Sequence, residues 1–265
     1  MRGTDTERKR DGTRSSLVWD VLAEVIAARV AQTGRTALDI VDVGAGTGGF
    51  AVSIASLGHR VTVVDPSPDA LAAARWRAAE AGVTLTEVQG EAGDLPALVG
   101  EPGPDGGGAD LVICHNVLEY VDSPSAALAA VARVLRPGGT VSVLAANTVA
   151  AVLQRALAGK YAEARAMLPA SVPSGTVPAA GTTTTPRRFT LPELTVLIEG
   201  AGLRAGEAHG IRIFSSLLPG AGADLVTAEA LRDLEEAAAT CPPLRDIATR
   251  LHVLARRADL GADQA

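Results

Sequence analysis

The sequence predicts an α/β protein built on a mostly parallel sheet, and three observations support this fold class. First, strand-like and helix-like segments alternate from residue 38 to residue 145, which predicts βαβ units. Second, the predicted strands are continuous apolar runs, which are typical of a sheet covered by helices on both faces. Third, glycines crowd the end of the first strand, and a helix-like segment begins directly after them at Phe50.

Local signals place each element of this sheet. Ser15 and Ser16 predict a helix cap, and apolar residues then recur at helical spacing until Gly34. Glycine, proline and acidic residues over 101–109 predict a surface loop, and 136–139 predicts a turn. The expected strands are 38–43, 60–64, 83–88, 110–114 and 140–145, and the expected helices are 50–57, 69–81, 95–99 and 124–135.

The alternation ends after Asn147. Residues 148–168 predict one or two amphipathic helices. Residues 169–186 are rich in proline, threonine and glycine and are too long for a simple connection, so they are either a lid or a partly disordered segment. The remaining expected elements are helices at 191–200 and 227–240 and strands at 203–215 and 247–255.

Composition argues against several classes of protein. The net charge of −6 is unlike that of a general nucleic-acid binder, which usually carries a basic footprint. Two distant cysteines and four scattered histidines predict neither a disulfide scaffold nor a metal site. No apolar run approaches the ~18 residues that a membrane span needs, and the polar N-terminus lacks the apolar segment of a signal peptide. We therefore expect a cytoplasmic protein with no membrane and no metal partner.

The glycine-rich turn predicts a binding site for an adenosine-type ligand. Its spacing fits a dinucleotide fingerprint and also the pattern Asp42-x-Gly44-x-Gly46-x-Gly48. Glycines reach positive φ without strain and let a ligand approach the backbone. Asp65 ends the second strand, where an acid can accept hydrogen bonds from ribose hydroxyls. The alternative is a tight turn that binds nothing.

Two acidic residues favour S-adenosylmethionine (SAM) over a nicotinamide dinucleotide. Asp42 precedes the first glycine, where its carboxylate could meet the ammonium group of SAM directly or through water, and NAD has no such cation. Asp94 follows the third strand, where an acid commonly contacts adenine. Each of the two could instead simply cap a turn.

Two further motifs carry a family resemblance. The segments Ala109-Asp-Leu-Val-Ile-Cys-His-Asn-Val-Leu-Glu-Tyr-Val-Asp-Ser-Pro124 and Val134-Leu-Arg-Pro-Gly-Gly-Thr140 resemble the fourth- and fifth-strand motifs of class I SAM-dependent methyltransferases. The resemblance covers residues 38–145. It implies an enzyme with SAM as cofactor and a Rossmann-like seven-stranded sheet, mostly parallel with the last strand antiparallel.

A looser resemblance spans nearly the whole chain and points to the bacterial tRNA 5-carboxymethoxyuridine methyltransferases, which esterify the carboxylate of a modified wobble uridine. It rests on 13–19, 115–121, 159–163, 199–202, 210–214 and 251–256. It implies that the SAM site is lined by Arg14, Gly44, Ala45, Asp65, Ala92, Gly93 and His115. With the residues of the motif itself, the candidate set also includes Asp42, Gly46, Gly48, Pro66 and Asp94.

These motifs divide the chain into five parts. The core is a SAM-binding domain with its N-terminal helix (14–146), and the C-terminal part of the same sheet is 190–258. Between them, 147–189 forms a helical and loop insertion on the substrate side. A disordered arm (1–13) precedes the core, and a tail (259–265) ends the chain.

The residues on the substrate side are compatible with the carboxylate acceptor that the resemblance implies. A carboxylate is already a nucleophile, so it needs positioning and desolvation but no general base, and no His-Asp pair is apparent. An arginine fork matches a carboxylate, and Arg212 is the first candidate, followed by Arg187 and Arg188. Each could equally be a solvated surface charge. Tyr120 and His115 could face the methyl group, although His115 could instead be structural.

The methyl acceptor stays open between two classes. One is a carboxylate or hydroxyl such as the tRNA wobble-uridine carboxylate, and the other is a small molecule, for instance a natural product, methylated on oxygen or nitrogen. An NAD(P)-dependent oxidoreductase would need a Tyr-x-x-x-Lys or histidine-based hydride-transfer site, which the sequence does not show. A non-catalytic SAM-binding module is the remaining alternative.

Overall fold

The structure is a computed structural model that describes residues 4–103, 107–168, 186–217 and 225–258, with side chains from residue 17 onward and not for 225–227. The chain forms two compact units. Unit 1 comprises residues 1–22, 145–194 and 208–252, and unit 2 comprises 23–144, 195–207 and 253–265. The predicted segment 169–186, except Pro186, and the predicted tail 259–265 lie outside the described residues.

The strands form one seven-stranded sheet in the order β3-β2-β1-β4-β5-β7-β6. The strands β1 to β5 pair in parallel, whereas β7 is antiparallel to both β5 and β6. This confirms the predicted sheet with its antiparallel last strand. The bounds are β1 Asp39–Val43, β2 Arg60–Asp65, β3 Thr86–Gln89, β4 Ala109–His115, β5 Leu135–Ala146, β6 Arg204–Ile211 and β7 Arg250–Arg256.

Some of the helices begin at a residue whose side chain caps their first N–H groups. The hydroxyl oxygen of Ser67 accepts from the backbone N–H of Ala70, and Ser123 does the same for Ala126. The bounds are α1 Thr4–Thr33, α2 Gly49–Ala55, α3 Pro68–Glu80, α4 Leu95–Val99, α5 Pro124–Val134, α6 Thr148–Leu157, α7 Tyr161–Ala166, α8 Leu191–Gly200, α9 Leu225–Ala238 and α10 Pro242–Arg245.

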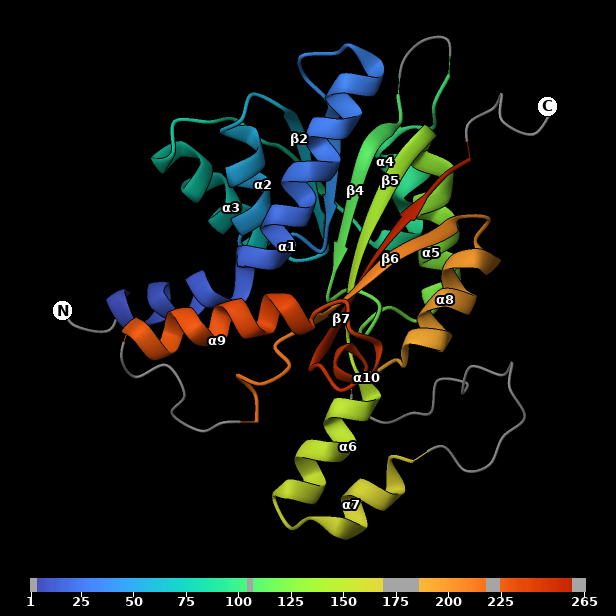
Figure 1. Cartoon of the computed structure of the whole chain (residues 1–265). Helices are drawn as coiled ribbons and strands as arrows, with labels where there is room; N and C mark the ends of the chain where they lie inside the picture. The colour runs from blue at the N-terminus through green and yellow to red at the C-terminus, as the bar shows by residue number, and fades with distance from the viewer. Residues whose placement is uncertain (1–3, 104–106, 169–185, 218–224, 259–265) are drawn as a thin grey trace. The chain divides into compact units, whose positions relative to one another are not determined.

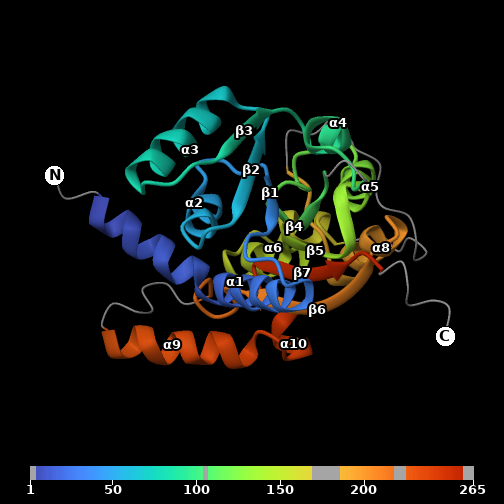
Figure 2. The same cartoon turned by 90° about the horizontal axis from the view of Figure 1, so that it is seen from above.

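In unit 2, helices cover both faces of the parallel strands. Helices α2 and α3 lie together against β2 and β3, while α4 and α5 lie on the other side of these strands (Figure 1, Figure 2). Ile40, Val63 and Ile113 on the central strands and Leu128 on α5 are almost wholly buried. Because both faces are covered, the strands carry the uninterrupted apolar runs from which the fold was predicted.

An ion-pair network closes the amino ends of β1 and β4. The buried carboxylate of Asp110 accepts hydrogen bonds from Arg29, Arg35 and Arg136 and from the backbone N–H of Asp39. Burial alone would raise the pKa of Asp39, but hydrogen bonds from Arg60, Arg35 and Arg136 outweigh it and hold the pKa well below its usual value. The network lies at the opposite end of these strands from the glycine-rich turn, so we regard it as structural.

Several predicted boundaries are wrong. The predicted strand 203–215 ends at Ile211 as β6, and the strand predicted from residue 83 begins at Thr86 as β3. Helix α1 begins at Thr4, so residues 4–13 are helical, and Ser15 and Ser16, expected as a cap, lie inside the helix. The stretch 7–10 favours a helix, whereas Gly12 does not. Residues 136–139, expected as a turn, lie inside β5. Gly138 donates to the carbonyl of Arg257, whose N–H donates back to Gly139, so a distant segment supplies the pairing that extends this strand.

Unit 1 is organised around the carboxyl end of β5. The Asn147 amide donates to the carbonyls of Asp246 and Ala248, and its side-chain oxygen caps α6 through the N–H of Val149. Phe189 is buried and forms a parallel bridge with Asn147. Helices α6 and α7 pack on each other (Figure 1). None of the helices among the described residues has the length and apolar character needed to cross a membrane.

Candidate functional site

The turn after β1 is shaped by glycines in the left-handed region. Gly44, Gly46 and Gly48 have φ values of 63°, 52° and 73°. A Cβ on Gly44 would lie 2.5 Å from the Cγ2 of Val117, so this glycine is needed both for its φ and for close packing. The turn then enters α2, whose first N–H groups lack intrahelical partners.

Asp65, the predicted ribose acceptor, is buried and organises the turn itself. Its Oδ2 accepts from the N–H of Gly46 at 2.9 Å, and its Oδ1 accepts from the N–H of Ser67 at 2.9 Å. Each carboxylate oxygen can accept a second bond, so capacity remains for ligand hydroxyls. One carboxylate thus ties the glycine turn of β1 to the end of β2.

Asp42 lies in β1 and is also buried. Burial and the negative charge of Asp65 raise the pKa of Asp42 to about 7, although the Ala51 N–H, which donates to it, has the opposite effect. This hydrogen bond from α2 means that Asp42 does cap the turn. A pair of adjacent carboxylates, one of them half protonated near neutral pH, also favours a cationic group nearby.

A cavity of about 350 Å³ lies within unit 2 and brings together several predicted residues. Gly44, Asp65, Pro66 and Ala92, all predicted for the cofactor, line it, and so does Tyr120, predicted for the substrate. The Tyr120 side chain is exposed. The cavity therefore opens at the carboxyl ends of β1, β2 and β4, where doubly wound sheets bind ligands.

The cavity includes residues that the sequence reasoning missed. Its further lining residues are Val43, Gly90, Glu91, Asn116, Val117, Val121 and Asp122. Asn116 has a φ of 57°, which is uncommon for a residue other than glycine and suits the position directly after a strand beside a ligand cavity. The position of an asparagine directly after a buried strand is the one signal in the sequence that could have indicated Asn116.

His115 occupies the core next to this cavity and does not line it. Its Nε2 lies 2.7 Å from the hydroxyl oxygen of Ser142, and its ring packs edge-on against Phe50 with centroids 5.1 Å apart. Burial lowers the pKa of His115 to about 3. The imidazole is therefore neutral at physiological pH and is a poor proton acceptor.

The other predicted cofactor residues do not line the cavity. Ala45 accepts from the N–H of Gly48 within the turn, and Gly93 and Asp94 lie in a short 3₁₀ helix at 92–94 that begins with the lining residue Ala92. Asp94 is exposed. The side chain of Arg14 is outside the described part of the structure.

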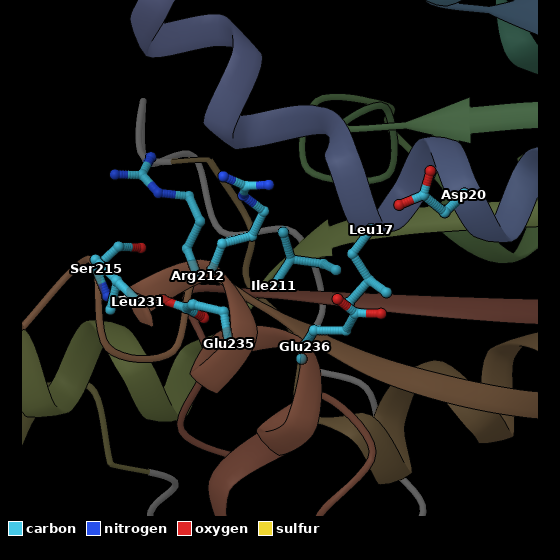
Figure 3. Close-up of a pocket in the computed structure, with 10 residues that line it drawn as sticks. Leu17, Asp20, Ile211, Arg212, Ser215, Leu231, Glu235 and Glu236 are labelled. Atoms are coloured by element: carbon cyan, nitrogen blue, oxygen red, sulfur yellow. Dashed lines mark hydrogen bonds between the residues drawn. The ribbon is translucent and has the colours of Figure 1, made fainter. Parts of the chain in front are cut away.

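Unit 1 holds the arginines that were predicted for the acceptor. Arg212 directly follows β6, has a φ of 61° and lines a second cavity of about 210 Å³ (Figure 3). The cavity lies between the carboxyl end of β6, the middle of α1 and the second half of α9. Its other lining residues are Leu17, Asp20, Gly210, Ile211, Ser215, Leu231, Arg232, Glu235 and Glu236. Arg212 therefore combines a positive charge with a constrained backbone beside a cavity.

Arg187 and Arg188 are partly exposed and directly precede Phe189. The N–H of Phe189 donates to the carbonyl of Ala146, so the bridge holds these arginines beside the carboxyl end of β5. Among the described residues, no group of three or more His, Cys, Asp and Glu side chains could hold a metal ion.

The unit 2 cavity fits an adenosyl ligand with a positive charge. Apolar side chains such as Val43 and Val117 suit the adenine and the thioether carbons, and Asp65 suits the ribose hydroxyls. The buried Asp42 beside Asp65 would gain from a nearby cation, because the cation would favour its ionised form. These residues are those that would hold SAM.

Comparison with known proteins agrees with this geometry. Residues 41–143 match the family model described as a methyltransferase domain. The chain is 27% identical over 246 residues to the tRNA 5-carboxymethoxyuridine methyltransferase of Escherichia coli O157:H7, covering 92% of this chain and 88% of that protein. It is 31% identical over 192 residues to the ubiquinone biosynthesis O-methyltransferase of Xanthomonas axonopodis pv. citri (strain 306), covering 72% of each. A solved S-adenosylmethionine-dependent methyltransferase from Mesorhizobium loti shares the fold, with a TM-score of 0.55, 19% identity and coverage of 92% of this chain and 100% of that one.

Proposed function

The chain belongs to the class I SAM-dependent methyltransferases, and from this premise we propose that it transfers the methyl group of SAM to a carboxylate oxygen, that of a 5-carboxymethoxyuridine in tRNA. The observation that carries the proposal is the extent of similarity. The alignment with the tRNA enzyme covers nearly the whole chain and therefore includes most of unit 1, where Arg187, Arg188 and Arg212 are found.

The chemistry of the site supports a carboxylate acceptor. When bound, SAM supplies a methyl group on a positively charged sulfur, which a carboxylate oxygen can attack without first losing a proton. A hydroxyl acceptor would benefit from a general base, but His115 is buried and its lowered pKa makes it a poor one. Among the residues that line the unit 2 cavity there is no histidine or lysine.

We assign the chain's residues two tasks. In unit 2, Asp42 and Asp65 favour the cationic donor, and the glycine turn lets SAM lie close to the protein backbone. In unit 1, Arg212 binds the acceptor carboxylate through its two parallel N–H donors, a geometry that a lysine cannot reproduce. Arg187 and Arg188 remain candidates for the same task or for the neighbouring phosphates.

The test is methyl transfer from labelled SAM to bulk tRNA prepared from a strain that lacks the gene. We expect label in the RNA fraction, and we expect mild alkali to release this label as methanol. A methyl ester hydrolyses under these conditions, whereas an O-methyl ether or an N-methyl group does not. Nucleoside mass spectrometry should identify the ester of 5-carboxymethoxyuridine. Label that resists alkali, or tRNA that takes no label, would refute the proposed acceptor.

A second candidate is a small-molecule O-methyltransferase. It is favoured by the similarity to the ubiquinone biosynthesis enzyme, which has the higher identity over a shorter alignment. In that case, an extract depleted of RNA would take up alkali-stable label. Treating the extract with ribonuclease before the reaction separates the two functions, because it removes only the tRNA acceptor.

A further inference from the structure

We propose that Glu235 on α9 is a positioning residue, which fixes the loop after β6 and thereby holds Arg212 in the geometry that binds the acceptor carboxylate. The proposal rests on the proposed function, because it assigns the contact with the carboxylate to Arg212. It adds a residue that neither the motifs nor the resemblance indicated, and one that need not touch the substrate.

Three consecutive backbone N–H groups donate to this one carboxylate. The N–H of Ile213 donates to Oε2 of Glu235 at 2.6 Å, and the N–H groups of Phe214 and Ser215 donate to Oε1 at 2.9 and 2.7 Å. An ionised carboxylate has about four acceptor sites, so the loop occupies most of them. Successive N–H groups that converge on an anion form a nest, and here a side chain of the same unit fills it.

Arg212 immediately precedes this nest and has an unfavourable backbone conformation. Its φ of 61° is in the left-handed region, which costs free energy for a long side chain. Its carbonyl accepts from the N–H of Thr249 at 3.2 Å and from the hydroxyls of Thr249 and Ser216 at 3.3 and 3.2 Å. Contacts on both sides of Arg212 therefore over-determine its conformation, a pattern that occurs at functional sites.

The residues around the loop restrict it further. A Cβ on Gly210 would lie 2.8 Å from the Cα of Arg245 and 2.9 Å from the Cβ of Ala248, so the chain just before Arg212 packs closely against the segment 245–248. Ile213 is wholly buried with Ala238, which lies on α9 shortly after Glu235. Arg212 and Glu235 both line the 210 Å³ cavity (Figure 3). The loop thus directs one cationic side chain to a cavity while its own N–H groups are satisfied from α9.

The first experiment tests the loop without any acceptor. Glu235→Gln keeps the size of the side chain but replaces one acceptor oxygen by an NH₂ group, which cannot accept from the loop. We expect at least one of the amides of Ile213, Phe214 and Ser215, first that of Ile213, which has Oε2 to itself, to exchange with deuterium at least about tenfold faster in this variant. Glu229→Gln, an exposed acid on the same helix, is the matched control and should leave them unchanged. Equal protection in wild type and Glu235→Gln would overturn the proposal.

The second experiment is a double-mutant cycle on methyl transfer to tRNA. Glu235→Gln should raise KM for tRNA roughly tenfold with little change in the affinity for SAM, and Arg212→Gln should do at least as much. If Glu235 acts through Arg212, adding Glu235→Gln to Arg212→Gln should change kcat/KM by less than about twofold. Independent losses that multiply would mean that Glu235 only supports the fold, and would overturn the positioning role.

The two proposals fail in different ways. If wild-type protein places no label in tRNA, the proposed acceptor is wrong, and the exchange experiment alone decides whether Glu235 fixes the loop. If tRNA is methylated but Glu235→Gln leaves both exchange and KM unchanged, the acceptor stands and the role of Glu235 is refuted.

Discussion

The raised pKa of Asp42 leads to a quantitative prediction for Asp42→Asn. Asparagine has nearly the same shape as the protonated carboxyl group and cannot ionise. In the ligand-free wild type, the pKa of Asp42 rises from its ordinary value of 3.8 to about 7, because the side chain is buried and lies near the charge of Asp65. This rise in pKa corresponds to about 4 kcal/mol of difference in free energy between the protonated and the ionised form.

The unfolding free energy depends on pH because the folded and unfolded states bind different numbers of protons at Asp42. Between pH 4 and pH 7 the folded state holds a proton on Asp42 that the unfolded state has already released, so the contribution of this group to stability falls as the pH rises through that range. Above pH 7 the loss is complete. Between pH 5 and pH 8, the wild type should therefore lose about 3 kcal/mol of unfolding free energy relative to Asp42→Asn.

The assay is urea unfolding of both proteins at pH 5 and pH 8 without SAM, followed by circular dichroism. Asp94→Asn removes an exposed carboxylate from the same unit and serves as the control for a change in net charge. Its unfolding free energy should change between pH 5 and pH 8 by the same amount as that of the wild type. If the unfolding free energy of Asp42→Asn also changes with pH as that of the wild type does, the buried carboxyl is not protonated near neutral pH and the prediction is refuted.

Three further predictions concern SAM binding and stability. Because the cationic donor should prefer ionised Asp42, SAM affinity measured by calorimetry should rise on the order of tenfold from pH 5.5 to pH 7.5, and this rise should vanish in Asp42→Asn. Asp110→Ala leaves several arginines without their buried partner and should lower the unfolding free energy, measured in urea, by about 3–5 kcal/mol. Glu101→Ala, which breaks an exposed ion pair, should lower it by only ~0–1 kcal/mol. Equal losses would contradict a stabilising role of the buried network. Gly44→Ala should abolish detectable SAM binding, and adding Val117→Ala should restore it only in part, because the contact is relieved but the positive φ is not; full recovery would show that φ at this position is unimportant.

Much of the fold could be read from the sequence, because its signals are local. The apolar runs lie within the strands that they predict, and the predicted helices 95–99 and 191–200 have the same bounds as α4 and α8. The exceptions depended on distant partners. Residues 136–139 carry turn-forming residues, but pairing of Gly138 and Gly139 with Arg257 draws them into β5. Local propensity could not reveal this, since the partner is near the other end of the chain.

The candidate site was predictable to the same extent. Asp42, Gly44 and Asp65 follow from strand ends and glycine spacing, and the structure gathers Gly44 and Asp65 at one cavity. For His115 the residue type suggested chemistry at the methyl group, but burial beside Phe50 and the hydrogen bond with Ser142 make it a neutral core residue. Burial is a property of the packed molecule, so the sequence left both readings of His115 open.

The sequence by itself determined the class of the methyl donor's site. A strand end, three glycines and an acid after the next strand are close together along the chain, and their backbone requirements depend little on the rest of the molecule. Only the tertiary structure decided which groups pair with the charged side chains. Asp110 gathers arginines from three segments, and Glu235 meets the loop after Arg212, because folding brings together groups that are far apart in sequence. Electrostatic partners are chosen by distance in space, and no periodicity along the chain records that distance.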